Sequence, residues 1–464
     1  MSTTEARISA RAADQLAQAL RGELIDPAHD RYEQARSVYN AMIDKRPALI
    51  ARCADVADVI ACVRFARAEG IDLAIRGGGH NGGGLGSVDD GLVADLSLLR
   101  GVRVEPDAHT VTVAGGTTLG EVDHALHAFG LAVPFGIIST TGVGGLTLGG
   151  GLGHLTRRYG LSIDNLIGAD VVLADGRLVR ASESEHEDLF WALRGGGGNF
   201  GVVTSLMFQA RPLSTVVAGP MLWPLEQAAE ALALYAEFLP AAPEELNGFF
   251  AFLTVPPAPP FPEELHLRKM CGVVWCYAGG TEDADRALAP VRAALPPALD
   301  GVMEMPLPAL QSAFDGLYPP GDQWYWRAGF VKAIPAQAIE AHVAHAHELP
   351  TWKSTMHLYP IDGAAGRVAP DATAWSYRDA HWAQVIVGVD PDPAKAGVLR
   401  DWTVGYWEAL HPFSLGGAYS NFLMDEGEDR VRASYGSNYE RLARVKAEYD
   451  PDNLFHVNQN IRPA

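Results

Sequence analysis

The chain has 464 residues, 48% of them hydrophobic, and its 36 basic and 56 acidic residues leave a formal net charge of -20. This length exceeds what one hydrophobic core usually fills, so two domains, or two lobes that share a site, are expected. The acidic balance is the opposite of the basic surface that binds a phosphate backbone, which argues against a nucleic-acid partner.

The N-terminal segment is amphipathic and not continuously hydrophobic. Its first 28 residues carry apolar residues at helical spacing among charges, without the apolar core of a secretory signal. The chain has no run of about 18 apolar residues, the length of a membrane span. Its four cysteines are too few for a disulfide scaffold. We therefore expect a cytoplasmic protein, monomeric or homodimeric, with no membrane partner.

The first half of the chain alternates short strands with helices. The periodicity predicts helices at 57–69, 119–129 and 189–193, and strands at 72–76, 92–96, 110–114 and 202–208. Asp175 and Gly176 mark a tight hairpin between strands 169–173 and 177–180.

From about residue 214 the pattern changes. Helices are predicted at 226–238, 283–295 and 337–348, strands at 249–255, 271–277 and 384–389, and a tail after Pro412 with its own helix at 438–448. This pattern indicates a separate α+β lobe with an antiparallel sheet. Cys271 and Cys276 lie in one strand at an odd separation, hence on opposite faces, and predict neither a disulfide nor a shared metal.

Glycine is concentrated in one region, because 29 of the 49 glycines fall within residues 76–201. They form three clusters, at 77–86, 142–153 and 195–201. Glycine permits positive φ and close approach of a ligand to the backbone, so the clusters predict three loops that converge on one large ligand. The alternative is a set of tight turns in a β-rich lobe.

Two of the clusters match G-x-G-x-x-G, through Gly77 to Gly82 and through Gly196 to Gly201. A dinucleotide fingerprint requires a helix directly after the glycines. Here more glycine and a strand follow the first match, and a strand follows the second. A doubly wound dinucleotide domain is therefore disfavoured.

His80 is the most suggestive single residue, because it lies among glycines and polar residues in the run 76–82. The HxxHxH run at 342–347 could bind a metal, but histidines late in a helix are simply explained by the helix dipole, so no metal site is predicted. The sequence has no G-x-S-x-G elbow, P-loop or H-E-x-x-H motif.

Other polar and aromatic residues are interpreted first as surface, loop or core residues. Arg157, Arg158, Asp164 and Asn165 follow the second glycine cluster and are interpreted as surface or loop-ordering residues. Aromatic residues are numerous enough to line a pocket, although core packing is the default for each; they are Tyr419, Tyr435 and the run Trp324, Tyr325 and Trp326.

Four ordered motifs resemble the berberine bridge enzyme-like FAD-linked oxidoreductases, of the vanillyl-alcohol oxidase and p-cresol methylhydroxylase superfamily. The resemblance runs from about residue 31 to the end. The motifs are Arg76-Gly77-Gly78-Gly79-His80, the glycine-rich run Thr141 to Gly151, the run Leu189 to Thr204, and Tyr449-Asp450-Pro451 with Asn458-Gln459-Asn460-Ile461.

The resemblance implies a two-lobed α+β fold. Residues 1–213 and 413–464 are expected to form the FAD-binding lobe, and residues 214–412 a substrate lobe. FAD is the implied cofactor, bound covalently through His80. The other residues expected to bind it are Arg76, Gly77, Gly78, Gly79, Asn81, Gly82, Ser139, Thr140, Thr141, Gly142, Gly144, Gly145, Gly149, Gly153, His154, Gly201, Val203, Asn421, Asn458 and Asn460.

The resemblance also implies roles for individual positions. Many members add a second flavin bond from a cysteine where this chain has Ile138, so a single covalent link is expected. Tyr419 matches the tyrosine that many members use as base, which needs cations or donors to stabilise its phenolate. Thr141 matches the residue that gates oxygen. The glutamate of berberine bridge enzyme has no counterpart, since Ala372 lies nearest, and its ring closure is not favoured.

The expected reaction is the oxidation of a small-molecule alcohol by FAD, with reoxidation by O2. Trp324, Tyr325 and Tyr377 are candidates for substrate contact. A dehydrogenase of the same fold that uses another electron acceptor is the alternative enzyme. A protein that sequesters a quinone-like drug is the alternative of a different class.

Overall fold

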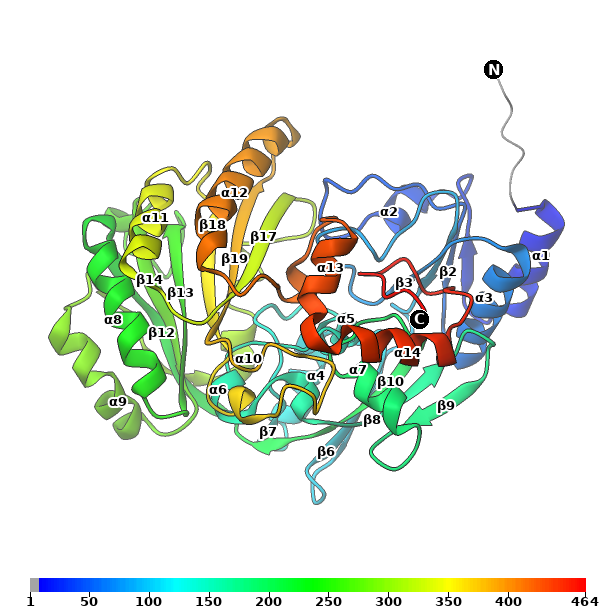
Figure 1. Cartoon of the computed structure of the whole chain (residues 1–464), viewed down its shortest axis with the longest axis horizontal. Coiled ribbons are helices and arrows are strands. Elements are labelled where there is room, and N and C mark those ends of the chain that lie inside the picture. Colours follow the sequence, from blue (N-terminus) through cyan, green and yellow to red (C-terminus); the bar gives the residue numbers. More distant parts are fainter. Residues whose placement is uncertain (1–7) are drawn as a thin grey trace.

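The computed structural model describes residues 8–464, so residues 1–7 of the first expected segment lie outside the described residues. Two lobes lie side by side, and the end of the chain, drawn in red in Figure 1, returns to the lobe that contains its beginning. Both lobes combine helices with sheets that are largely antiparallel. The predicted α+β class is therefore confirmed.

The first sheet of the first lobe delivers the first glycine loop. Its order is β1 (Glu23–Ile25), β2 (Leu49–Arg52), β4 (Leu92–Asp95), β3 (Leu73–Arg76), and β2 and β3 both run parallel to β4. The crossover from β2 to β3 is α3 (Val56–Glu69), which Asp55 caps at the start and Gly70, at a φ of 62°, ends. The chain thus leaves β3 directly into the glycines at 77–79.

The third glycine cluster, at 195–201, leads directly into a strand of a five-stranded antiparallel sheet. The order of this sheet is β5 (Val102–Glu105), β6 (Thr110–Ala114), β10 (Val202–Gln209), β8 (Leu166–Val172) and β9 (Leu178–Ala181), with the predicted β8–β9 hairpin at its edge. The remaining elements of this lobe are α1 (Ala10–Ala19), α2 (Tyr32–Arg36), α4 (Leu119–His127), β7 (Leu131–Ala132), α5 (Val143–Leu148), α6 (Thr156–Tyr159), α7 (Glu187–Leu193) and β11 (Arg211–Pro212).

The second lobe is one large antiparallel sheet covered by helices on one face (Figure 1). Its strands, in spatial order, are β15 (Leu299–Asp300), β12 (Thr215–Pro224), β14 (Lys269–Tyr277), β13 (Leu246–Thr254), β18 (Thr355–Pro360), β19 (Trp382–Asp390) and β17 (Gln323–Val331), with β16 (Met303–Pro306) on β12. The helices on this face are α8 (Ala228–Ala241), α9 (Thr281–Ala294), α11 (Ala336–His347) and α12 (Ala396–Leu410), whereas α10 (Leu307–Gln311) packs on the opposite face.

Side chains alternate in direction along these strands, so neighbouring residues belong to two different apolar cores. Met356 and Leu358 belong to the core beneath the helices. Tyr359 belongs to a second core, between the sheet and the first lobe. Successive strand residues point to opposite faces, so the sheet covers its own helices with one face and forms the wall of an interlobe space with the other. Cys271 and Cys276 likewise lie in different cores, as their spacing predicted.

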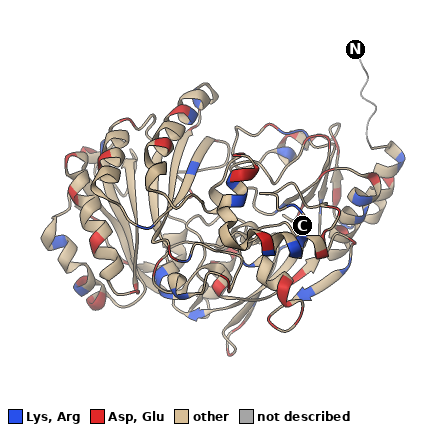
Figure 2. Cartoon of the chain, viewed as in Figure 1, with Lys and Arg blue, Asp and Glu red and all other residues tan. Residues whose placement is uncertain are grey.

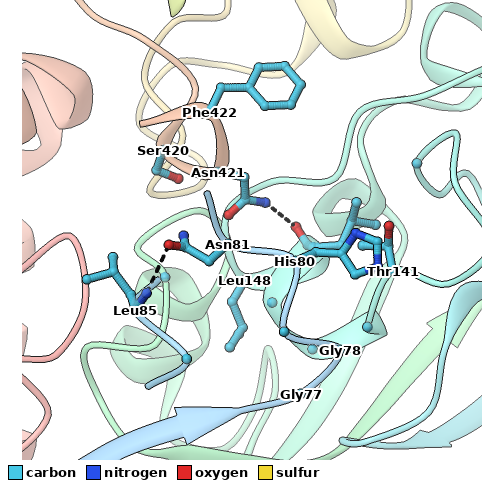
Figure 3. Close-up of a pocket in the computed structure, with 18 of the residues that line it drawn as sticks. Gly77, Gly78, His80, Asn81, Leu85, Thr141, Leu148, Ser420, Asn421 and Phe422 are labelled. Atoms are coloured by element: carbon cyan, nitrogen blue, oxygen red, sulfur yellow. Dashed lines mark hydrogen bonds between the residues drawn. The ribbon is translucent and has the colours of Figure 1, made fainter. Parts of the chain in front are cut away.

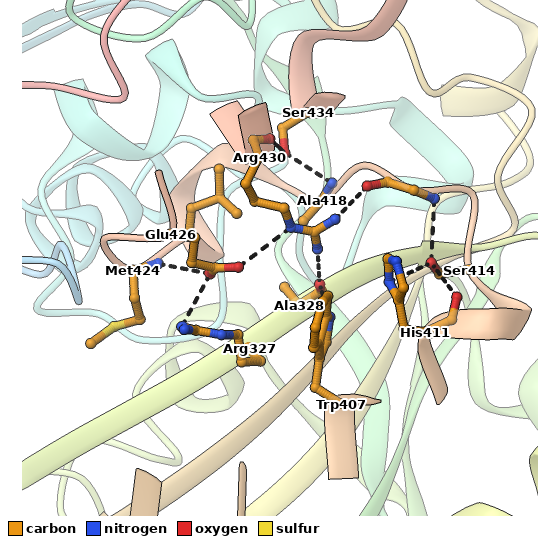
Figure 4. Close-up of polar contacts among 12 residues, drawn as sticks. Arg327, Ala328, Trp407, His411, Ser414, Ala418, Met424, Glu426, Arg430 and Ser434 are labelled. Atoms are coloured by element: carbon orange, nitrogen blue, oxygen red, sulfur yellow. Dashed lines mark hydrogen bonds and ion pairs between the residues drawn. The ribbon is translucent and has the colours of Figure 1, made fainter. Parts of the chain in front are cut away.

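The tail crosses back over both lobes. Helices α13 (Glu428–Tyr435) and α14 (Tyr439–Tyr449) pack into the core of the first lobe. A buried ion-pair cluster joins the tail to β17: Glu426 lies 3.4 Å from both Arg327 and Arg430, and Arg430 donates to the carbonyl oxygen of Ala328 at 2.5 Å (Figure 4). These contacts hold the loop that carries Tyr419 against the sheet.

Arg157 is not a surface residue. Its side chain is 1% exposed and bridges the lobes. The guanidinium donates to the Asp362 carboxylate at 2.9 Å and to the carbonyl oxygens of Ala242 at 3.2 Å and Pro243 at 3.1 Å. The partner carboxylate lies 205 positions away, so the local sequence could not reveal the bridge.

We expect Arg157→Met to lower the free energy of unfolding by about 3 kcal/mol, because it leaves the buried Asp362 carboxylate and the carbonyl oxygens without their donor. Urea unfolding of the two proteins measures the difference. Arg158→Met is the matched control, since Arg158 is partly exposed and only packs over Tyr159. Equal losses in the two variants would contradict the bridge.

Within residues 8–464, no helix is long and apolar enough to cross a membrane.

One histidine of the run at the end of α11 is part of the core. His342 is buried, and its Nδ1 lies 2.7 Å from the hydroxyl of Tyr406.

Candidate functional site

One cavity lies where the two lobes and the tail meet, and its wall comes from all three. Figure 3 shows residues of the glycine loops and of the tail on this wall. The glycine loops form one side, strands β17, β18 and β19 form the opposite side, and the tail segment 419–422 lies between them. Many of the predicted site residues meet on this wall. They are Arg76, Gly77, Gly78, Gly79, His80, Asn81, Thr141, Gly142, Gly144, Gly145, Gly201, Val203, Trp324, Tyr419, Asn421 and Asn458.

On the glycine side of the cavity, the loops have little side-chain bulk, so a ligand can approach their backbone closely. A Cβ on Gly78 would collide with the backbone nitrogen of Gly142, so the first two loops touch directly. Gly79 and Gly197 have a φ of 72°, which L side chains rarely adopt. Beneath the loop, Arg76 pairs with Asp95 at 2.9 Å. The result is a rigid cradle of main-chain groups, which fits a large dinucleotide.

His80 projects from the first loop into this cradle. Its ring stacks on Tyr39, with 4.0 Å between centroids and an interplanar angle of 21°. The Nε2 atom lies 3.0 Å from the hydroxyl of Thr140, which leaves Nδ1 without a partner among the described residues. Burial lowers the pKa of His80 to about 4. The imidazole is therefore neutral near pH 7, and a nitrogen lone pair is available for bonding.

Tyr419 presents its hydroxyl to the same cavity from the tail. The hydroxyl oxygen accepts hydrogen bonds from the backbone N–H of Gly151 at 3.0 Å and from the Asn421 amide at 2.7 Å. These are the donors that a phenolate needs. Burial nevertheless outweighs them and raises the pKa of Tyr419 to about 12, so donors alone do not depress the pKa as the assignment as base requires.

Three predicted glycines serve packing instead of the cavity wall. A Cβ on Gly82 would collide with the indole of Trp326, one on Gly149 with the amide of Asn421, and one on Gly153 with the carbonyl oxygen of Phe135. Each allows a neighbouring segment to approach the backbone. Gly149 in particular lets the tail place Asn421 beside Tyr419.

Four more predicted cofactor contacts also lie off the wall. Ser139 donates its N–H at 3.0 Å, and its hydroxyl, to the carboxylate of Asp315. Thr140 bonds to His80, so it acts through that residue. His154 is buried, and neither of its ring nitrogens has a hydrogen-bond partner within residues 8–464; the same holds for the buried amide oxygen of Asn460.

Two predicted substrate contacts are not on the wall. Tyr325 neighbours Trp324 on β17 and therefore faces the other way, where its ring packs with Arg327. Tyr377 stacks on Phe330, with ring centroids 4.5 Å apart, and donates its hydroxyl to the Ala433 carbonyl oxygen at 2.7 Å.

Several wall residues escaped the sequence analysis. Strand β18 contributes Thr355, His357 and Tyr359, whose period-2 spacing was the available signal. Others pack around them with no local signature; these are Tyr39, Phe314, Tyr318, Val385, Val387, Ser420 and Phe422. Trp326 and Tyr435, both predicted as aromatic candidates for a pocket, also line the wall.

Two family models and several curated proteins match this chain. Residues 47–182 match a model described as an FAD binding domain, and residues 418–462 match one described as berberine and berberine like. An uncharacterised FAD-linked oxidoreductase of Bacillus subtilis is 32% identical, with 96% of this chain and 97% of that protein covered. The (R)-6-hydroxynicotine oxidase of Paenarthrobacter nicotinovorans is 29% identical, with 96% and 97% covered.

Solved structures agree. The 6-hydroxy-D-nicotine oxidase of Arthrobacter nicotinovorans superposes with a TM-score of 0.86 at 27% identity, covering 96% of this chain and 98% of that one. The xylooligosaccharide oxidase of Myceliophthora thermophila also gives 0.86, at 26% identity with 98% and 99% covered. The chain therefore belongs to the berberine bridge enzyme-like FAD-linked oxidoreductases, and it is an FAD-dependent enzyme.

Proposed function

We propose that this enzyme is an oxidase that converts an alcohol (a sugar, a secondary alcohol or a phenolic natural product) to the carbonyl compound, with FAD bound covalently through His80 alone. Bound in the cavity, FAD supplies the two-electron chemistry by accepting a hydride from the substrate and passing the electrons to O2. The carbinol loses a hydride from carbon and a proton from oxygen. O2 takes up two electrons and two protons and becomes H2O2.

The placement of Tyr419 is the observation that carries this proposal. Its oxygen already accepts two hydrogen bonds, from Gly151 and Asn421, which leaves its remaining position for the substrate hydroxyl. The two fixed donors stabilise the phenolate form of Tyr419, which is the form that can take the proton from the substrate hydroxyl. Two of the named relatives, the 6-hydroxynicotine and xylooligosaccharide enzymes, are oxidases, which supports O2 as acceptor.

His80 supports the covalent link. Thr140 occupies Nε2, so Nδ1 of the neutral ring is the atom that could bond to the flavin. Ile138 lines the cavity where a second link would require cysteine, and none of the four cysteines lies on the wall. A histidyl bond would hold the cofactor and tune its potential.

Thr141 lies on the cavity wall beside His80 (Figure 3), and its side chain is smaller than that of leucine. We expect the reduced enzyme to reoxidise quickly in air and Thr141→Leu to slow this step by steric exclusion without slowing flavin reduction. Stopped-flow mixing of reduced enzyme with O2 measures it, and the isosteric Thr141→Val is the control. Slow reoxidation in the wild type would favour the dehydrogenase.

A screen of sugars, secondary alcohols and phenolic alcohols, read by peroxide release, tests the oxidase proposal. At least one alcohol should give peroxide and carbonyl product in equal amounts. A ligand that perturbs the flavin spectrum but never gives peroxide, with or without artificial electron acceptors, would instead identify a binding protein.

A further inference from the structure

The sheet side of the cavity carries a polar pair to which no role has been assigned. His357 and Tyr359 lie two residues apart on β18, so both side chains point to the cavity face. The Nδ1 atom of His357 is 2.6 Å from the Tyr359 hydroxyl. The hydroxyl of Thr355, on the same face, is already used by the Phe252 carbonyl oxygen at 2.7 Å. His357 Nε2 has no partner among the described residues.

Either proton arrangement of this pair leaves Nε2 open for one hydrogen bond. If Tyr359 donates to Nδ1, Nε2 carries the proton and donates. If Nδ1 donates to Tyr359, Nε2 accepts. A hydroxyl group satisfies both cases because it is both donor and acceptor. Burial lowers the pKa of His357 to about 3, so the ring stays neutral near pH 7 and offers no charge to pair with an ion.

The pair lies away from Tyr419. Phe422 packs against a tyrosine of each site, with its ring centroid 4.8 Å from that of Tyr419 and 5.8 Å from that of Tyr359. His357 lies beyond Tyr359 and packs on Phe249 at 5.1 Å. A substrate whose carbinol sits at Tyr419 therefore reaches His357 with a second, distant group.

The rest of this side is uncharged and aromatic. Among the described residues that line the cavity, Arg76 is the one with a permanently charged side chain, and Asp95 already pairs with it. In Figure 2 charged residues colour the outer helices, whereas the strands of the second-lobe sheet are almost entirely tan. Trp324, Trp326 and Phe314 offer broad aromatic faces. A charged substrate group would be buried here without a partner, which is strongly unfavourable.

We propose that His357, positioned by Tyr359, binds a second hydroxyl group of an uncharged aromatic alcohol, and that this contact sets the enzyme's substrate class. The inference rests on the proposed oxidase function for the identity of the reacting carbon. It narrows the range of alcohols and excludes ionised substrates as preferred ligands.

Tertiary alcohols test the contact without turnover, because they have no carbinol hydrogen to lose as hydride. The probes are 2-(4-hydroxyphenyl)propan-2-ol, its parent 2-phenylpropan-2-ol, the anion 4-(2-hydroxypropan-2-yl)benzoate and the cation 2-[4-(aminomethyl)phenyl]propan-2-ol. Calorimetric titration of the oxidised holoenzyme at pH 7 gives each Kd. The phenol should bind about five- to tenfold more tightly than its parent, and at least about tenfold more tightly than either ion.

Variants assign the effect to the pair. His357→Phe keeps an aromatic ring and should abolish the advantage of the phenol over its parent, and Tyr359→Phe should reduce it. His347→Gln, at an exposed histidine on α11, should leave the advantage intact. A phenol that does not bind, an advantage that survives His357→Phe, or an ion that binds as tightly as the phenol would overturn the proposal. Failure of the oxidase function, seen as unreduced flavin with hydrogen-bearing alcohols, leaves these affinities unaffected.

Discussion

Replacing His80 with alanine is expected to convert the flavin from a covalent to a dissociable ligand. Acid-precipitated wild-type protein should stay yellow, whereas His80→Ala protein should release its flavin into the supernatant. The reason is that His80 supplies the free Nδ1 on the cavity wall, in a ring kept neutral by burial. Absorbance of pellet and supernatant after precipitation measures the outcome.

The matched control for this experiment is Thr140→Val, which removes the partner of Nε2 but leaves Nδ1 in place. Its pellet should remain yellow. A colourless wild-type pellet would disprove the covalent link. Mass spectrometry of flavin peptides checks the single attachment, because a second crosslink to cysteine would contradict the role given to Ile138.

Replacing Tyr419 with phenylalanine is expected to slow flavin reduction by roughly 100-fold or more, the loss that follows removal of a positioned base. Anaerobic stopped-flow measures the rate, and the flavin spectrum should change little. Tyr435→Phe is the control, since Tyr435 also lines the cavity but bonds to the Gly196 carbonyl oxygen at 3.3 Å. Equal rates in wild type and Tyr419→Phe would move the search for the base elsewhere.

The pH dependence follows from the same residue. The pKa of Tyr419 is about 12, so the phenolate that accepts the proton becomes more populated as pH rises. The reduction rate should therefore increase from pH 7 to pH 10 without reaching a plateau. This increase should disappear in Tyr419→Phe, and a plateau near pH 7 in the wild type would contradict the assignment.

The sequence predicted the local features well, for physical reasons that are easily stated. Helix α3 has both a cap and a terminating glycine, and strand β6 has the bounds Thr110–Ala114 that its alternation indicates. The glycine clusters at 77–79 and 142–145 do meet on one wall, because positive φ and close approach are properties of the residue itself.

Features that depend on distant partners could not be predicted. Glycine patterns alone do not distinguish a ligand cradle from close packing, which is why Gly82, Gly149 and Gly153 were assigned to the cofactor. The position of β18 in the sheet decides that His357 faces the cavity, and one of its two partner strands, β13, lies far earlier in the chain. One error was avoidable: the adjacent strand residues Trp324 and Tyr325 cannot both face the cavity.

Anaerobic mixing of the holoenzyme with 4-(1-hydroxyethyl)phenol, followed by admission of O2, tests the account most directly. The oxidised flavin absorbance should bleach as the ketone forms, and O2 should then restore this absorbance with release of one H2O2 per ketone. A flavin spectrum that shifts but never bleaches, even at saturating alcohol, would contradict it.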